Sequence, residues 1–313
     1  MLAGRSAEKG TAVQADRDAP SRFPLALVGL DRLMASSSGS RSVRVALLDG
    51  PVATSHPDLA DAHLQAVGDG PGAACTQRHS GACAHGTFVA GILAASRGSR
   101  APALCPGCTL LVRPIFREVT GDGHLPAATP EEVAEAILEC VSAGARVLNL
   151  SAAIAEPSTR VERRLRESLD YAAVRGALVV AAAGNQGTLG SSVITRHPWV
   201  IPVVAYDRQG RPTRESNLGS SMGRRGLGAP GEAIESLGSE DAPHVGGGTS
   251  AAAAFVTGAI ALLWSLLPSA GPSELKHAVT YGGRRSGVSP PLLDAEAALE
   301  ILGRGARGSE LRA

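Results

Sequence analysis

Apolar and polar positions along the chain follow two different periods. Longer segments show the helical period, among them residues 85–95, 130–143 and 159–175. Between them lie short runs that are apolar at consecutive positions, which is typical of strands buried on both faces. These runs are residues 43–49, 110–116, 146–150, 177–182 and 199–206. Because strands and helices alternate, the pattern predicts an α/β fold with a mostly parallel sheet between helices.

Two of the helical segments differ in their expected surroundings. Segment 159–175 has its charged residues on one face and apolar residues on the other, which predicts a surface helix. The apolar positions are Val161, Leu165, Leu169 and Ala172. Segment 251–267 is apolar, rich in alanine and shorter than the roughly 20 residues of a membrane span. It predicts a buried core helix that begins near Thr249, and no membrane partner is expected.

Composition and charge narrow the range of functions. Of the 313 residues, 44% are hydrophobic and 19% are charged, with a formal net charge of +1. This balance is typical of a globular protein and gives no electrostatic reason to expect a nucleic-acid partner. The polar ends predict flexible segments at 1–22 and 303–313 around one folded domain at 23–302. The N-terminal segment lacks the apolar run of a secretory signal, so a cytoplasmic location is expected.

Ser250 is the first candidate for chemistry. Three glycines precede Thr249 and Ser250, and an apolar helix follows. Glycines let the backbone approach a bound molecule closely, and the N–H groups at a helix start favour negative charge. Ser250 is therefore well placed to act as a nucleophile. The alternative is that Ser250 or Thr249 only caps the helix.

Three further polar residues stand at the ends of predicted elements. Asp49 ends the strand 43–49, at the edge where open α/β sheets bind ligands, and Asn185 follows the strand 177–182. His85 begins a helix of small residues. Each has an ordinary structural alternative: a turn aspartate, a capping or core histidine, and an Asx-turn in place of an oxyanion donor.

The order of these residues along the chain is more informative than any one of them. Aspartate, histidine and serine follow one another as in the subtilisin triad, and two other known triad orders do not fit. The surrounding segments resemble the signatures of the subtilase family (peptidase family S8) over about residues 43–267: Asp49-Gly50, His85-Gly86-Thr87, Ala183-Gly184-Asn185 and Gly248-Thr249-Ser250. The resemblance implies a three-layer subtilisin-like fold and a serine endopeptidase.

The resemblance also implies a role for each residue. His85 would take the proton of Ser250 during attack on a peptide carbonyl, while Asp49 would hold the imidazole. Asn185 would donate to the oxyanion. The implied substrate-binding residues are Ser151, Ala152, Ala153 and Gly184.

A narrower resemblance concerns the substrate. Segments 45–52, 55–57, 106–108, 114–116 and 227–232 are similar to the protease domains of cyanobactin maturation enzymes, which cut ribosomally made precursor peptides. A peptide or precursor-peptide substrate and biosynthetic partner enzymes are therefore expected. No insertion in the sequence supports macrocyclisation.

Three departures from the family pattern leave a rival hypothesis. The chain has Phe88 where a second histidine is usual, Ala254-Phe255 in place of Pro-His, and Ala153 in place of glycine. A catalytically weak or silent peptide-binding module would tolerate such changes. An α/β-hydrolase esterase is disfavoured, because Ser250 is followed by Ala251-Ala252 and does not complete the G-x-S-x-G motif.

The cysteines leave several alternatives open. There are five, an odd number, so at least one thiol is expected to be free: Cys75, Cys83, Cys105, Cys108 and Cys140. Pairing within 75/83 or 105/108, free thiols and a metal site are all compatible with the spacing. Cys83 lies near His85 and predicts sensitivity to thiol reagents. No cofactor is expected; the family allows a structural calcium ion, but Gly121-Asp122-Gly123 lacks the later carboxylates of a calcium loop.

Overall fold

Seven parallel strands form the central sheet of the computed structural model, which describes residues 23–68, 72–119, 128–151, 159–283, 285 and 287–310. Their order across the sheet is β2-β3-β1-β4-β5-β6-β7. In chain order the strands are β1 (Arg44–Asp49), β2 (His63–Ala66), β3 (Thr109–Pro114), β4 (Val147–Leu150), β5 (Leu178–Ala182), β6 (Val200–Tyr206) and β7 (Leu227–Pro230). The predicted α/β class with a mostly parallel sheet is confirmed.

Both faces of the sheet are buried, which explains the consecutive apolar positions. In β1, Val45 and Leu47 belong to one core cluster, whereas Ala46 and Leu48 belong to the other. Successive side chains of a strand point to opposite faces. A strand covered on both sides must therefore be apolar at every position rather than at alternate ones.

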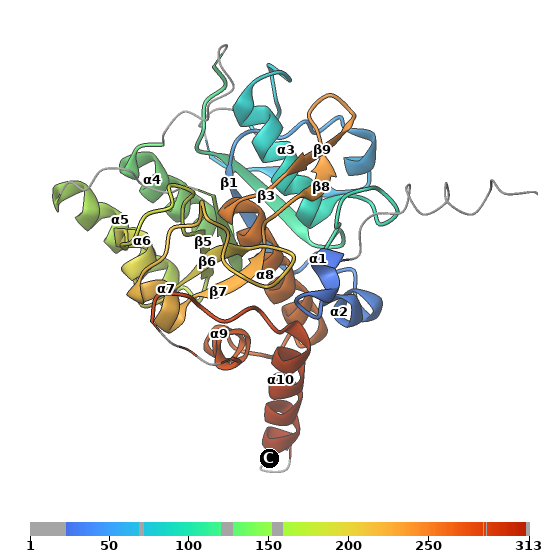
Figure 1. Cartoon of the computed structure of the whole chain (residues 1–313). Coiled ribbons are helices and arrows are strands. Elements are labelled where there is room, and N and C mark those ends of the chain that lie inside the picture. The colour runs from blue at the N-terminus through green and yellow to red at the C-terminus, as the bar shows by residue number, and fades with distance from the viewer. Residues whose placement is uncertain are drawn as a thin grey trace, which may run out of the picture.

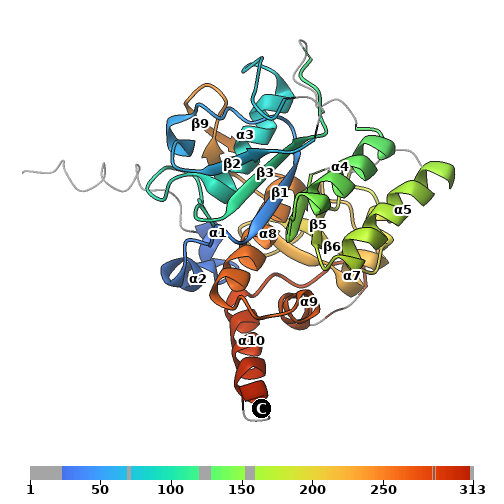
Figure 2. The same cartoon turned by 180° about the vertical axis from the view of Figure 1, so that it is seen from behind.

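Helices cover the two faces and make the outer layers (Figures 1 and 2). On one side lie α2 (Leu30–Ser36), α3 (Gly81–Ala94), α8 (Thr249–Leu266) and α9 (Pro272–Tyr281); on the other lie α4 (Pro130–Ser142) and α5 (Thr159–Val174). The amphipathic helix α5 buries Leu165, Leu169 and Ala172 as predicted, and the side chain of Val161 lies outside the described part. The α8 segment is long and apolar enough for a membrane span, but 89% of it is buried inside the protein.

The remaining elements surround this core. The segment predicted as loops with short strands contains α7 (Ser220–Arg225), β7 and an antiparallel hairpin of β8 (Ile234–Leu237) and β9 (Pro243–Gly246). The short helices are α1 (Phe23–Ala26), η1 (Pro57–Leu59) and α6 (Val193–Arg196). The hairpin packs on α3 and leads directly into α8.

The last helix, α10 (Ala295–Glu310), continues past Leu302, beyond which the polar composition predicted a flexible tail. An ion pair one helical turn apart, between Glu300 and Arg304 at 3.3 Å, contributes to this extension. The other predicted flexible segment, 1–22, lies outside the described residues, as does 311–313.

Candidate active site

Asp49 and His85 form a buried pair at the carboxyl end of β1. Asp49 is fully buried, and its Oδ1 lies 2.6 Å from Nδ1 of His85. The same oxygen accepts the N–H of Gly50 at 2.6 Å. Among the described residues, the other carboxylate oxygen, Oδ2, is buried and has no hydrogen-bond partner. His85 is thus the main partner of a carboxylate that is removed from water.

This pairing sets the charge state of the imidazole. Burial by itself favours the neutral ring, but the charge of Asp49 and its hydrogen bond outweigh burial and raise the pKa of His85 above 6.5. The imidazole keeps an exposed fraction of 21%, so its other face remains open to a bound molecule. A histidine held by a buried carboxylate is suited to accept and release a proton.

Close backbone packing brings α3 onto the end of β1. A Cβ on Gly50 would overlap the carbonyl oxygen of Ala82, and one on Gly86 would overlap the carbonyl oxygens of Gly50 and Pro51. Only glycines permit this approach. The hydroxyl of Thr87 adds a hydrogen bond, accepted from the N–H of Ala53 at 2.9 Å.

The start of α3 differs from the prediction. The helix begins at Gly81 rather than at His85, and the Ser80 side chain caps it by accepting the N–H of Cys83 at 3.1 Å. The small residues after the cap carry no helical period, which is why the sequence pattern missed this first turn. His85 is therefore within the helix, where its backbone is held by regular hydrogen bonds.

Asn185 and the first turn of α8 are tied together. The Oδ1 of Asn185 accepts hydrogen bonds from the N–H and the hydroxyl of Thr249, at 2.9 and 3.0 Å. The Thr249 hydroxyl also accepts the N–H of Gly184 at 3.1 Å. Asn185 is exposed, and its side chain bonds to Thr249, which is distant in the sequence. In the Asx-turn alternative, the side chain would bond to the backbone of its own turn. With Oδ1 engaged, Nδ2 is the end of the amide that can donate to a substrate.

Ser250 lies in the first turn of α8 and is 5% exposed. The N-cap residue is Gly248, at φ +84°, which has no side chain, and the Asn185 side chain accepts the first N–H of the helix. The alternative that Ser250 or Thr249 caps α8 is therefore wrong. The Ser250 hydroxyl is not used in capping and remains available for chemistry.

The four principal candidates lie along the same edge of the sheet. Parallel pairing places Leu48 beside Leu150, and Leu150 beside Ala181, so the residues after β1, β4 and β5 lie at the same level. Among the described residues, hydrogen bonds join Asp49 to His85 and Asn185 to Thr249, but none joins His85 to Ser250. Bonds between base and nucleophile often shorten only when substrate binds.

Two buried polar residues at this edge were missed from the sequence. Asn149 donates from Nδ2 to the Ser151 hydroxyl at 3.3 Å and accepts at Oδ1 from the Thr257 hydroxyl at 2.9 Å. Asn149 and Thr257 are both fully buried. The only signal for them in the sequence is a polar residue within an apolar strand and another within an apolar helix. They connect the expected substrate-binding Ser151 to the helix that carries Ser250.

The other expected substrate-binding residues are only partly described. Gly184 is buried and adopts φ +104°, which favours glycine at the turn before Asn185. Ala152 and Ala153 lie outside the described residues.

The family departures that are described lie in the core. Phe88 is 3% exposed, and its ring contacts that of His244 edge-on, with centroids 5.5 Å apart. Ala254 and Phe255 are fully buried within α8. These substitutions change packing and remove none of the candidate groups above.

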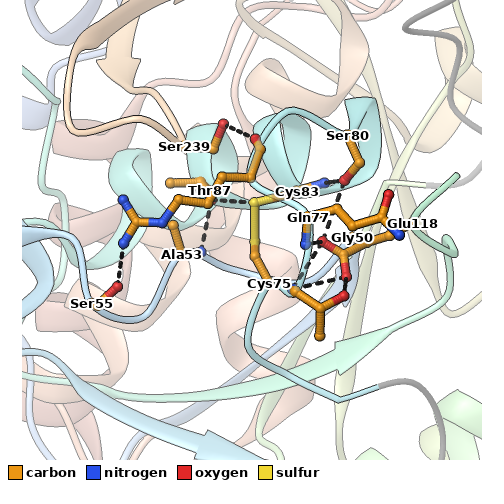
Figure 3. Close-up of a disulfide and its surroundings, with 12 residues drawn as sticks. Gly50, Ala53, Ser55, Cys75, Gln77, Ser80, Cys83, Thr87, Glu118 and Ser239 are labelled. Atoms are coloured by element: carbon orange, nitrogen blue, oxygen red, sulfur yellow. Dashed lines mark hydrogen bonds between the residues drawn. A yellow bond between two sulfur atoms is a disulfide. The ribbon is translucent and has the colours of Figure 1, made fainter. Parts of the chain in front are cut away.

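A disulfide joins Cys75 to Cys83, two residues before His85 in the chain (Figure 3). Of the pairings left open by the sequence, 75/83 is therefore present, and Cys105, Cys108 and Cys140 are buried free thiols. The two bonded sulfur atoms and the Glu118 carboxylate lie within 4.8 Å of one another. A disulfide sulfur is not a thiolate ligand, so this group is not a metal centre in the oxidised chain.

Comparison with known proteins agrees with the geometry of this edge. The model of the subtilase family of peptidases matches residues 40–282. The chain therefore belongs to the subtilase family, a class of serine endopeptidases. The family resemblance predicted from the four motifs is confirmed.

Individual relatives extend over most of the chain. It is 29% identical to fervidolysin of Fervidobacterium pennivorans over 80% of this chain and 39% of that protein. It is 27% identical to subtilisin DY of Bacillus licheniformis, over 89% of this chain and 98% of the relative. The match to mycosin-3 of Mycobacterium tuberculosis is 30% identical and spans 69% of this chain and 59% of the relative.

Solved structures show the narrower similarity. A mutant of the protease domain of PatA matches with a TM-score of 0.77 and 29% identity, over 87% of this chain and 99% of that one. The prenylagaramide maturation protease PagA matches with a TM-score of 0.75 and 27% identity, over 88% and 98%. The PatG macrocyclase domain, at 19% identity, shares the fold with a TM-score of 0.75. The predicted similarity to cyanobactin maturation proteases is confirmed.

Proposed function

We propose that this chain cuts a peptide bond of a precursor peptide, with Asp49, His85 and Ser250 as its catalytic triad. The observation that carries the proposal is the 2.6 Å hydrogen bond between the buried Asp49 and the partly exposed His85, at the sheet edge where α8 begins. A buried carboxylate that holds a partly exposed imidazole is the orienting half of a triad. Ser250 supplies the nucleophile, because its hydroxyl is not used to cap α8.

In the proposed reaction, Nε2 of His85 takes the proton of the Ser250 hydroxyl as its oxygen attacks the peptide carbonyl. Asp49 fixes the tautomer through Nδ1 and stabilises the imidazolium. The Nδ2 group of Asn185 and the N–H of Ser250 donate to the oxyanion of the tetrahedral intermediate. The imidazolium then protonates the leaving amine, and water, deprotonated by His85, releases the acyl group.

The substrate class is supported by the similarity to PatA and PagA, whose names describe maturation proteases. We therefore propose a precursor peptide as substrate and other enzymes of the same biosynthesis as partners. Hydrolysis is the proposed outcome. A candidate precursor is a short gene-encoded peptide that this chain cuts at one position.

Labelling with a fluorophosphonate tests the triad directly. The wild-type protein, His85→Ala and Ser250→Ala are treated at pH 8 and mapped by mass spectrometry. Modification of Ser250 is expected in the wild type and in neither variant. Modification of wild type and His85→Ala alike would contradict the role of His85. A wild type that binds peptide but is never labelled would favour the silent binding module.

A further inference from the structure

We propose that Cys75–Cys83 is a site of thiol–disulfide exchange, and that its opening by a dithiol reductant lowers peptidase activity by loosening the loop beside His85. The loss of activity rests on the proposed function, whereas the exchange chemistry does not. The loop consists of residues 75–83 and is called the disulfide loop below.

The disulfide lies between two parts of the catalytic edge. Cys75 donates its N–H to the carbonyl of Val52 at 3.0 Å, close after Asp49 in the chain. Cys83 is in the first turn of α3, two residues before His85. The disulfide loop therefore spans from the segment that follows Asp49 to the helix that holds His85 (Figure 3).

Polar contacts attach the disulfide loop on both sides of the disulfide, where Figure 3 shows Glu118 and Ser239. The Glu118 carboxylate accepts the N–H groups of Thr76 and Gln77 at 2.9 and 2.8 Å. The Ser239 hydroxyl donates to the carbonyl of Arg78 at 2.6 Å. Ser239 belongs to the β8–β9 hairpin.

An ion pair strengthens the connection to the hairpin. The guanidinium of Arg78 lies 3.1 Å from the carboxylate of Asp241, and a second nitrogen of Arg78 donates to the Ser55 hydroxyl. The hairpin leads through Gly246–Gly248 to Ser250. The disulfide loop thus connects the element that carries His85 with the one that leads to Ser250.

The two sulfur atoms differ in a way that sets the direction of exchange. Cys75 is half-buried, whereas Cys83 is fully buried. An incoming thiolate therefore reaches the sulfur of Cys75. Cys83 is then the leaving group, in the first turn of α3, where the positive end of the helix favours a thiolate and burial and the Glu118 carboxylate disfavour one.

The exchange balances as a two-electron reduction. One thiolate of the dithiol attacks Cys75, the Cys75–Cys83 bond breaks, and Cys83 leaves as a thiolate that takes up a proton. The second thiol of the dithiol, as a thiolate, attacks its partner sulfur in the mixed disulfide, and Cys75 leaves and is protonated. The products are two cysteine thiols and the cyclic or protein disulfide of the reductant.

Opening the disulfide leaves the triad contacts in place. The close packing at Gly50 and Gly86 and the bond from Ala53 to Thr87 hold α3 on the sheet without it. What loosens is the disulfide loop and its connection to the hairpin, so substrate positioning suffers more than the reactivity of Ser250. A loss of positioning of this kind lowers kcat/KM by about 10- to 100-fold.

The test compares oxidised and dithiothreitol-reduced protein without denaturant. Each sample is divided into three portions. One is alkylated with iodoacetamide and mapped, one is assayed on a fluorogenic peptide, and one is labelled with the fluorophosphonate. We expect alkylation of Cys75 and Cys83, a 10- to 100-fold lower kcat/KM, recovery on reoxidation, and Ser250 labelling in both states.

Two variants serve as controls. The double variant Cys75→Ser/Cys83→Ser is expected to show the low activity of the reduced protein and no response to dithiothreitol. Cys140→Ser changes a buried free thiol and is expected to respond as the wild type does. If the double variant does not fold, the recovery of wild-type activity on reoxidation tests whether the disulfide controls activity.

Two results would overturn the proposal. One is a Cys75–Cys83 pair that resists dithiothreitol in the folded protein, seen as no alkylation. The other is complete alkylation of both residues with kcat/KM unchanged. Absence of cleavage and of Ser250 labelling in both states would instead count against the proposed function, while the alkylation map would still decide the exchange.

Discussion

The hydroxyl of Thr257 donates a 2.9 Å hydrogen bond to Oδ1 of Asn149, between two side chains that are completely buried. Thr257 lies two helical turns after Ser250, and Asn149 also donates to Ser151. This bridge connects the helix of the proposed nucleophile to the end of β4. Polar groups in such a position are costly to leave unpaired.

Thr257→Val tests this bridge. Valine preserves the shape of the side chain but leaves Oδ1 of Asn149 buried without a donor, which costs about 1–3 kcal/mol of unfolding free energy. We expect a lower kcat/KM as well, because Asn149, the partner of Ser151, is no longer held in place by the Thr257 hydroxyl. Urea unfolding and peptide kinetics measure both effects. Thr257→Ser keeps the hydroxyl and should stay close to wild type; equal losses in the two variants would contradict the role of the bond.

The Asp49–His85 pair predicts a particular pH dependence. His85 must be neutral to act as a base, and its pKa is raised above 6.5. Activity should therefore fall as pH decreases through this raised value. The stability that the charged pair contributes runs the opposite way: it is present at low pH and is lost as pH rises through the folded pKa. A plot of kcat/KM against pH locates the acidic limb.

Asp49→Asn is the matching variant. With the charge of Asp49 removed, burial alone acts on the imidazole, so the pKa of His85 should fall and the acidic limb should move to lower pH. In serine protease triads, this substitution costs about 10⁴-fold in kcat. An unchanged limb in the variant would show that another group controls the profile.

Asn185 is expected to act in the transition state. Asn185→Asp keeps an oxygen that can accept from Thr249 but replaces the donor amide with a negative charge. We expect kcat to fall with KM nearly unchanged, by at least the roughly 100- to 1,000-fold seen when subtilisin loses its oxyanion-hole amide. Steady-state kinetics separate the two parameters. A rise in KM alone would assign Asn185 to ground-state binding instead.

Lys276 offers a test of electrostatics away from the site. Burial and the nearby charge of Arg225 lower its pKa to about 8, and its ammonium lies 4.9 Å from the ring centroid of Trp199. The sequence has one other lysine, Lys9. Acylation with acetic anhydride at a series of pH values should show Lys276 reacting with a midpoint near its pKa of about 8. Arg225→Gln should move the midpoint upward, and an identical midpoint would exclude the proposed cause.

Much of the fold was predictable because its strands are buried on both faces. Consecutive apolar runs located five of the seven strands of the sheet, and the long apolar run located α8. Strand β2, with the sequence HLQA, has no buried position and so has no apolar signal. The start of α3 was missed because its first turn consists of small residues after Ser80.

The site residues that belong to sequence motifs were predictable, whereas those defined only by tertiary contacts were not. Asp49, His85, Asn185 and Ser250 stand at the ends of elements, where sequence order and spacing are informative. The bridge of Asn149 and Thr257 joins residues that are 108 positions apart, and no local pattern predicts such a pair. Likewise, the spacing of five cysteines left the pairing open, because loop geometry decides which sulfur atoms meet.

The burial of α8 has a consequence for how the molecule should lose activity on heating. Ser250 begins a helix that the rest of the core encloses, so the serine half of the catalytic edge can melt only with the whole domain. The disulfide loop beside His85 is instead held by one disulfide and a few polar contacts. Thermal inactivation should therefore begin at the disulfide loop, below the temperature of global unfolding, and should be reversible on cooling as long as the core remains intact.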